Sequence, residues 1–354
     1  MAVAALALAG CSHPVLQESS GEIERESVMS LVHEQAPPAV LEETPDKGTE
    51  IQFQNVHLSV APHIALDVRH LRGRMRPIDG SGPVLFDDKR SFIIHLTRAT
   101  IALSPSGLEH LLNDHVFGYE GAPLRNLRVR FTAPYLVQQG LLHKVVDIPF
   151  EITALPSVSS DGEIRIHPVA MRIFNVDGSG LMKSLHMTLE KMLDLHRAVG
   201  VRAEENDLLL DPAKILPPPR IEGRIASVGV TDGMLVQTFV DSSAPPSEVA
   251  ALKPPADSEP NYMYFHGGTL RFGKLFMVHA DMQLVDSDPR DPFTFSVDEY
   301  NRQLVAGYSK NTPAMGLEVY MPDLDKTDRP LDPTTLRRER QIAHDGAPAP
   351  SRAP

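Results

Sequence analysis

The sequence predicts an α+β protein: a long, highly curved antiparallel sheet wrapped around a long amphipathic helix, with a C-terminal β-rich extension. Three observations predict this class. Residues 51–240 mostly alternate between apolar and polar side chains, in long runs rich in β-branched and aromatic residues. One stretch, 181–199, instead repeats its apolar residues at helical spacing. Alternation then returns after residue 260, which predicts the extension.

The chain opens MAVAALALAGCSHP, and its single cysteine directly follows a short apolar run. The tetrapeptide LAGC, which ends at Cys11, resembles a bacterial lipobox. That resemblance implies that residues 1–11 carry a signal segment and that Cys11 is acylated, which would anchor the chain to a membrane. Ser12 in place of aspartate implies the periplasmic side of the outer membrane. The alternative is a free thiol in a disordered tail.

Residues 12–50 are acidic, polar and interrupted by prolines, and we expect a disordered tether there. The alternating runs begin at residue 51. In the first run Ile51 and Phe53 share one face, and Val56 and Leu58 continue that face after a shift of phase. Prolines inside later runs indicate edges, bulges or bends, at Pro134, Pro149 and Pro168.

Two helices are expected to interrupt the strands. The first has capping-box spacing from Ser106 to Glu109, and its apolar residues repeat at helical intervals until Gly118. The second runs through LMKSLHMTLEKMLDLHRAV, and one face of it carries Leu181, Leu185, Leu189, Met192 and His196. Such a stripe packs against a core by default, and lining a ligand site is the alternative.

After the second helix the prolines of LPPP interrupt the chain, and a hairpin follows with Asp232-Gly233 in its turn. This order of sheet, long helix, LPPP and closing hairpin resembles the tubular lipid-binding (TULIP-like) superfamily over residues 51–240. The resemblance implies an apolar tunnel between sheet and helix that holds lipid acyl chains. The lining that it implies is Leu181, Leu185, Leu189, Met192, Ile94, Leu96, Val129, Phe131, Ile152 and Ile173. A filled core would use the same residue types and is the alternative.

The C-terminal third is predicted to be a linker, a further β segment and a tail. Residues 241–260, DSSAPPSEVAALKPPADSEP, are typical of an interdomain linker or a long surface loop. Residues 261–325 combine alternating runs with a helix that has capping-box spacing between Ser296 and Glu299. We expect this segment to extend the same sheet, and we expect residues 326–354 to be disordered.

Few residues suggest chemistry. Asp286, Asp288 and Asp291 in DSDPRD are a weak metal candidate, because clustered carboxylates suit calcium but the EF-hand spacing is missing. Aspartates that only form turns are the alternative. The histidines follow no zinc-ligand spacing, and the sequence has no nucleophile elbow, phosphate loop or dinucleotide fingerprint. We therefore expect no catalytic residues, no cofactor and no enzymatic activity.

A formal net charge of −12 argues against nucleic acid as a partner. Together these observations predict a membrane-tethered lipoprotein of the bacterial envelope that binds or carries lipid, or another long apolar ligand, in an apolar groove. The alternative is a structural or scaffolding lipoprotein, without enzymatic activity, that binds another envelope protein. A hydrolase acting on envelope polymers is a more remote third hypothesis.

Overall fold

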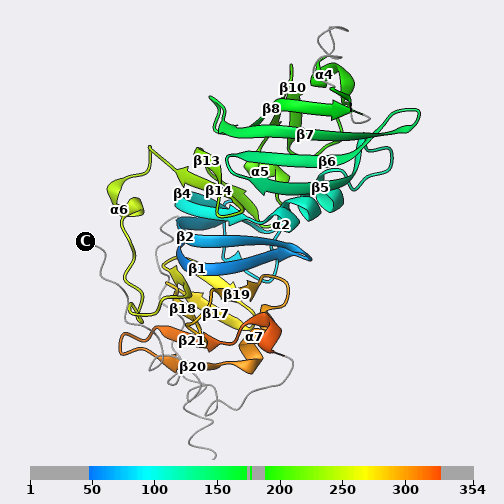
Figure 1. The fold of residues 1–354 in the computed structure, drawn as a ribbon. Helices are drawn as coiled ribbons and strands as arrows, with labels where there is room; N and C mark the ends of the chain where they lie inside the picture. Colours follow the sequence, from blue (N-terminus) through cyan, green and yellow to red (C-terminus); the bar gives the residue numbers. More distant parts are fainter. Residues whose placement is uncertain (1–47, 174–175, 178–187, 328–354) are drawn as a thin grey trace, which may run out of the picture. The chain divides into compact units, whose positions relative to one another are not determined.

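The computed structural model describes residues 48–173, 176–177 and 188–327 (Figure 1). All of these belong to one compact unit, Asp46–Pro354. The predicted signal segment with Cys11, nearly all of the tether, and the tail beyond residue 327 lie outside the described residues. So do Leu181 and Leu185 of the second predicted helix.

A large, mostly antiparallel sheet forms around the two longest strands, β1 (Thr49–Ala61) and β2 (Ile64–Pro77). Its strand order is β13 (Ile225–Thr231), β14 (Met234–Val240), β4 (Phe92–Leu103), β2, β1, β15 (Tyr262–His266), β18 (Asp281–Asp286), β21 (Leu317–Met321) and β20 (Tyr308–Asn311). Two short strands add parallel pairings, β12 (Arg220–Glu222) on β4 and β19 (Phe293–Ser296) on β1. Because β15 pairs with β1, residues 261–325 continue the sheet that begins at residue 49.

A second sheet is built from the middle of the chain. Its order is β10 (Val201–Glu204), β11 (Asp207–Leu210), β8 (Ile164–Ile173), β7 (Asp147–Val158), β6 (Tyr135–His143) and β5 (Leu124–Thr132), with β9 (Val176–Asp177) paired to β8. A small third sheet holds β17 (Leu275–Val278), β16 (Thr269–Phe272) and β3 (Val84–Leu85). Strand β13 of the large sheet packs against β7 of the second sheet.

The alternating pattern is confirmed in β1. Ile51 and Phe53 are buried, and Val56 and Leu58 are buried again after one step out of phase. Asn55, with φ of 50°, absorbs that step in the left-handed region that asparagine tolerates. The hairpin β13–β14 is confirmed too, because Asp232 and Gly233 both have positive φ, as a two-residue type I′ turn requires.

The first predicted helix is present as α2 (Pro105–His110), which continues into a π-helix, η1 (Leu111–Val116). Its N-cap is Ser104, whose Oγ accepts a hydrogen bond from the Gly107 N–H at 3.0 Å, so the predicted capping box from Ser106 is wrong. The helix predicted after Ser296 is α7 (Tyr300–Ala306), and the Ser296 hydroxyl accepts from the Glu299 N–H at 3.1 Å. Short helical turns complete the structure at α5 (Pro212–Ile215), α6 (Pro246–Val249) and η2 (Leu324–Lys326).

The predicted fold class is wrong in its central feature. The longest helical segment of the described residues is α2 with η1, and the described part of the second predicted helix holds only α4 (Leu189–Met192). At its start the Leu189 N–H donates to Asn206 Oδ1 and the Glu190 N–H donates to the Glu205 carbonyl, and after Met192 the backbone is already extended at Leu193. Large sheets with short helices therefore replace a sheet wrapped around one long helix. None of the helices seen in the described ranges is long and apolar enough to span a bilayer.

Candidate apolar ligand site

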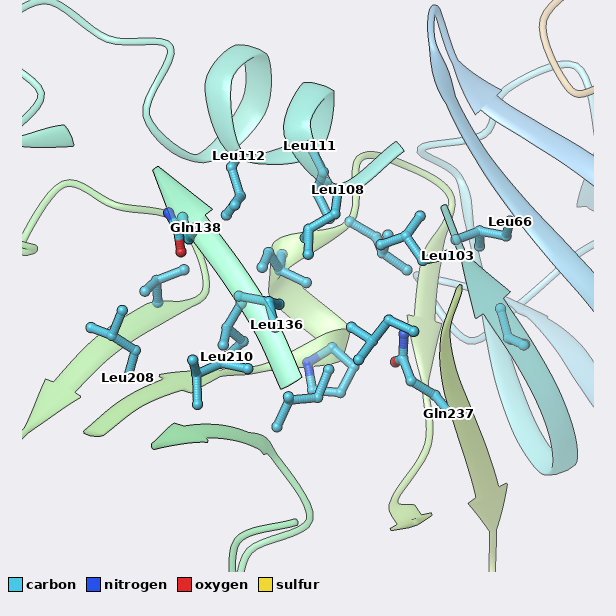
Figure 2. Close-up of a pocket in the computed structure, with 18 of the residues that line it drawn as sticks. Leu66, Leu103, Leu108, Leu111, Leu112, Leu136, Gln138, Leu208, Leu210 and Gln237 are labelled. Atoms are coloured by element: carbon cyan, nitrogen blue, oxygen red, sulfur yellow. The ribbon is translucent and has the colours of Figure 1, made fainter. Parts of the chain in front are cut away.

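An apolar cavity lies between the large sheet and the second sheet, beneath α2 and η1 (Figure 2). Its volume is about 70 Å³, counted as the space that the centre of a water molecule can reach. That is room for about five waters. Every lining residue is apolar except two glutamines. The lining consists of Leu66, Ile101, Leu103, Leu108, Leu111, Leu112, Phe117, Leu124, Leu136, Gln138, Ile164, Ile166, Val201, Leu208, Leu210, Pro212, Ile215, Leu216, Ile221, Leu235, Gln237 and Phe239.

The roof of the cavity is the α2–η1 segment, from which Leu108, Leu111 and Leu112 point into the space (Figure 2). Side chains of this segment fasten it to the outer edge of β5. Asn113 donates from Nδ2 to the Leu127 carbonyl at 2.8 Å, and its Oδ1 accepts from the Leu127 N–H at 2.8 Å. Glu109 Oε1 accepts from the Val129 N–H at 2.7 Å. The two side chains thus satisfy backbone groups at an edge strand that would otherwise lack a neighbour.

Two buried glutamines supply the polar groups of the cavity wall, and they lie at opposite ends of it (Figure 2). Gln138 on β6 and Gln237 on β14 are each 8% exposed. Neither side-chain amide has a hydrogen-bond partner within the described part of the chain. Their amide atoms are not among the fully buried polar atoms that lack a partner in the described residues, so they keep some accessible surface and offer donors and acceptors to a ligand or to water.

A second, smaller apolar space of about 30 Å³ adjoins the first. The two share Leu124, Gln138 and Leu208. Four residues predicted as lining are found on this second space: Ile152, Ile173, Leu189 and Met192. The structure therefore gathers these four at one end of a two-part apolar region.

The remaining described residues of the predicted lining lie elsewhere. Ile94, Leu96 and Val129 are buried in the main hydrophobic core, and Phe131 packs against it half-exposed. Sequence reasoning missed the roof leucines as lining, although it predicted their helix. It also missed the glutamines, whose signal is polarity at an inward position: Gln138 follows Leu136, and Gln237 falls between Leu235 and Phe239, on the buried face of each strand.

The acidic candidate is arranged differently from the prediction. Carboxylate oxygens of Asp286, Asp291 and Asp323 lie within 4.8 Å of one another, whereas Asp288 forms an ion pair with Arg290. Burial, together with the charge of Asp323, raises the pKa of Asp286 to about 8. The Lys326 ammonium lies 2.8 Å from Asp323, 2.9 Å from Asp288 and 4.0 Å from Asp291, so a side chain of the protein itself supplies positive charge to this group.

The histidines of β1 and β4 and of the β1–β2 turn, His57, His95 and His63, do not converge on one site. His57 pairs with Asp67, His95 lies 3.3 Å from Asp241, and His63 stacks on His110 with ring centroids 4.8 Å apart. These pairs sit on different strands and turns, and each has a local partner.

No family model matches this chain, and neither a curated protein nor a solved structure matches it significantly. The resemblance to the TULIP-like superfamily and to a lipobox therefore stays a prediction.

Proposed function

We propose that this protein binds a slender apolar ligand, a single acyl chain, in the cavity between its two large sheets. The observation that carries the proposal is the wall itself, a partly open apolar surface interrupted only by two glutamine amides that have no partner among the described residues. Small-molecule sites have this composition, mostly apolar with a few polar groups that fix orientation. The small volume suits a short stretch of one extended chain rather than a two-chain lipid.

The expected driving force is removal of the chain from water. Each buried methylene contributes about 0.8 kcal/mol, so the roughly five methylenes that fit in the space of about five waters gain about 4 kcal/mol before ordering costs are subtracted. No reaction is assigned to the cavity, because its lining provides amides and apolar groups and no acid, base or nucleophile. Anchoring through acylated Cys11 at the periplasmic side of the outer membrane is part of the same proposal, and it depends on residues outside the described part.

Native mass spectrometry of the purified full chain, combined with titration of 1-dodecanol, tests the proposal. We expect co-purifying apolar ligand, or stoichiometric binding of dodecanol. Leu112→Trp fills the cavity from its roof and should lower the affinity for dodecanol at least about tenfold. Leu155→Trp, on an exposed position of β7, is the matched control and should leave the affinity unchanged.

A urea unfolding curve for each variant separates lost binding from lost folding. If Leu112→Trp folds and binds dodecanol as well as the wild type does, the cavity is not the site. A ligand-free mass with no binding of dodecanol would favour the alternative, a scaffolding lipoprotein that binds another envelope protein.

A further inference from the structure

A polar, open cleft of about 510 Å³ adjoins the apolar cavity on the outer side of η1 and β5. The cleft and the cavity share Phe117 and Leu124, and Leu124 also borders the smaller apolar space. Among the described residues, only these two side chains line both the cavity and the cleft. An amphiphile whose chain occupies the cavity would pass them with its polar end in the cleft.

The charges of the cleft leave one cation uncompensated. The carboxylate of Glu109 accepts from the Val129 N–H and lies 3.4 Å from the Arg128 guanidinium. The carboxylate of Asp114 lies 2.9 Å from His110 Nδ1. Arg125, half-buried on the same wall, has no ion pair and no hydrogen bond from its guanidinium to any described residue. Both acidic groups of the cleft are thus engaged locally, whereas Arg125 is available to an anion.

Tyr119 adds a neutral donor to the same wall. Its hydroxyl oxygen is buried and has no hydrogen-bond partner among the described residues. The Arg197 guanidinium lies over its ring, 4.6 Å from the centroid, and holds the ring in place. Burial raises the pKa of the Tyr119 hydroxyl, which therefore remains a donor at neutral pH. An unused hydroxyl donor and an unpaired guanidinium that line one cleft are a combination that oxygen anions satisfy.

The position of Arg125 follows from a β-bulge in β5. The register with β6 shifts between Arg125 and Arg128, and Asn126 has φ of 51°. The two hydrogen bonds between Asn113 and Leu127 hold this bulge in place. A bulge re-aims the side chains beside it, and bulges are frequent next to binding sites.

We infer that this cleft binds the anionic headgroup, a carboxylate or a phosphate monoester, of the single-chain amphiphile whose tail fills the apolar cavity, through Arg125 and Tyr119. The inference rests on the proposed function and specifies its ligand class. A neutral headgroup would leave the Arg125 charge without an oxygen partner, so the headgroup charge decides the affinity difference between ligands of equal chain length.

The test compares dodecanoate, dodecyl phosphate and 1-dodecanol by calorimetry on the full chain. We expect each anion to bind roughly five to ten times more tightly than the alcohol, because the site is partly open to water. Arg125→Gln should reduce anion affinity to that of the alcohol and leave the alcohol unchanged. Tyr119→Phe should weaken the anions a few-fold. Arg130→Gln, on an exposed position of the same strand outside the cleft, is the matched control and should change neither.

The outcomes separate the two proposals. Equal affinity for all three ligands, or an anion preference that survives Arg125→Gln, overturns the headgroup site and leaves acyl-chain binding intact. Failure of all three ligands to bind overturns the proposed function itself. A preference that is lost in Arg125→Gln and kept in Arg130→Gln supports the site, and the tighter of the two anions identifies the headgroup.

Discussion

Replacing Asn113 by alanine should loosen the roof of the cavity more than any other single polar substitution on η1. The Asn113 side chain makes hydrogen bonds of 2.8 Å to the Leu127 carbonyl, 2.8 Å from the Leu127 N–H and 2.9 Å to the Glu109 carbonyl. Leu127 is only 1% exposed, so water cannot easily replace these partners at its backbone. Three lost bonds at about 0.5–1.5 kcal/mol each, with two backbone groups left buried, give a loss of roughly 2–4 kcal/mol in the free energy of unfolding.

The assay is urea unfolding followed by circular dichroism, with the midpoint and the slope fitted separately. Asp114→Ala is the matched control on the same helix, because its exposed ion pair with His110 should contribute less than about 0.5 kcal/mol. A loss below about 1 kcal/mol for Asn113→Ala would show that the clamp between η1 and β5 is not a stabilising feature. A changed slope would instead indicate that the roof unfolds before the sheets.

Three further predictions concern the large sheet. Glu50→Gln should cost about 2–4 kcal/mol of unfolding free energy, because the Glu50 carboxylate lies 3.1 Å from the buried Arg72 and 2.8 Å from the buried Arg74. The control Glu222→Gln affects an exposed pair with Arg220 and should cost under about 0.5 kcal/mol, and equal losses for the two variants would contradict the argument. Gly267→Ala and Gly268→Ala both place alanine at positive φ, which should cost about 1 kcal/mol of stability in each variant. A Cβ on residue 268 would also lie 2.6 Å from the Gly48 carbonyl carbon, so thermal unfolding should show Gly268→Ala less stable than Gly267→Ala by at least about a further 2 kcal/mol. The hydrogen bond that protonated His57 donates to Asp67 raises the pKa of His57, so this pair's contribution is complete below about pH 6.5 and is lost as the pH rises through the folded-state pKa. The free energy of unfolding should therefore fall more between about pH 5.5 and about pH 8.5 in the wild type than in His57→Gln, by under about 1 kcal/mol for this half-exposed pair, and identical pH dependence would contradict the assignment.

The sheet strands were predictable because local pattern and tertiary burial agree. In β1 the order of apolar residues alone predicts the alternation, including the step at Asn55. The turn of the β13–β14 hairpin is likewise predicted by its two residues, Asp232 and Gly233, alone. The sequence does not show which strands pair. The pairing of β15 with β1 joins residues about two hundred positions apart, and no local pattern of either strand encodes that choice.

The second predicted helix shows how a helical stripe misleads. Leu189 and Met192 are indeed on the apolar side, against Met171 and the smaller apolar space. The stripe places Leu189 and Met192 correctly, but His196, which it puts on the same face, is exposed beside Asp194, and only one helical turn forms in the described part. At α4 the turn between β10 and β11 supplies acceptors to the first backbone N–H groups, and Leu193 returns to an extended conformation. These bonds cap the start of α4, and a helical stripe alone does not fix where the helix ends.

The candidate site was predictable in type and not in position. Leucine and isoleucine serve equally in a packed core and in a cavity wall, so Ile94 and Leu96 could not be distinguished from Leu108 and Leu136 by residue type. The glutamines differ in this respect. If the space between the sheets were simply core, leucine at positions 138 and 237 would fill it without placing two unpartnered amides in an apolar wall. The presence of both glutamines at opposite ends of one apolar space is explained if a ligand in that space, or the water that the ligand displaces, forms hydrogen bonds with their amides.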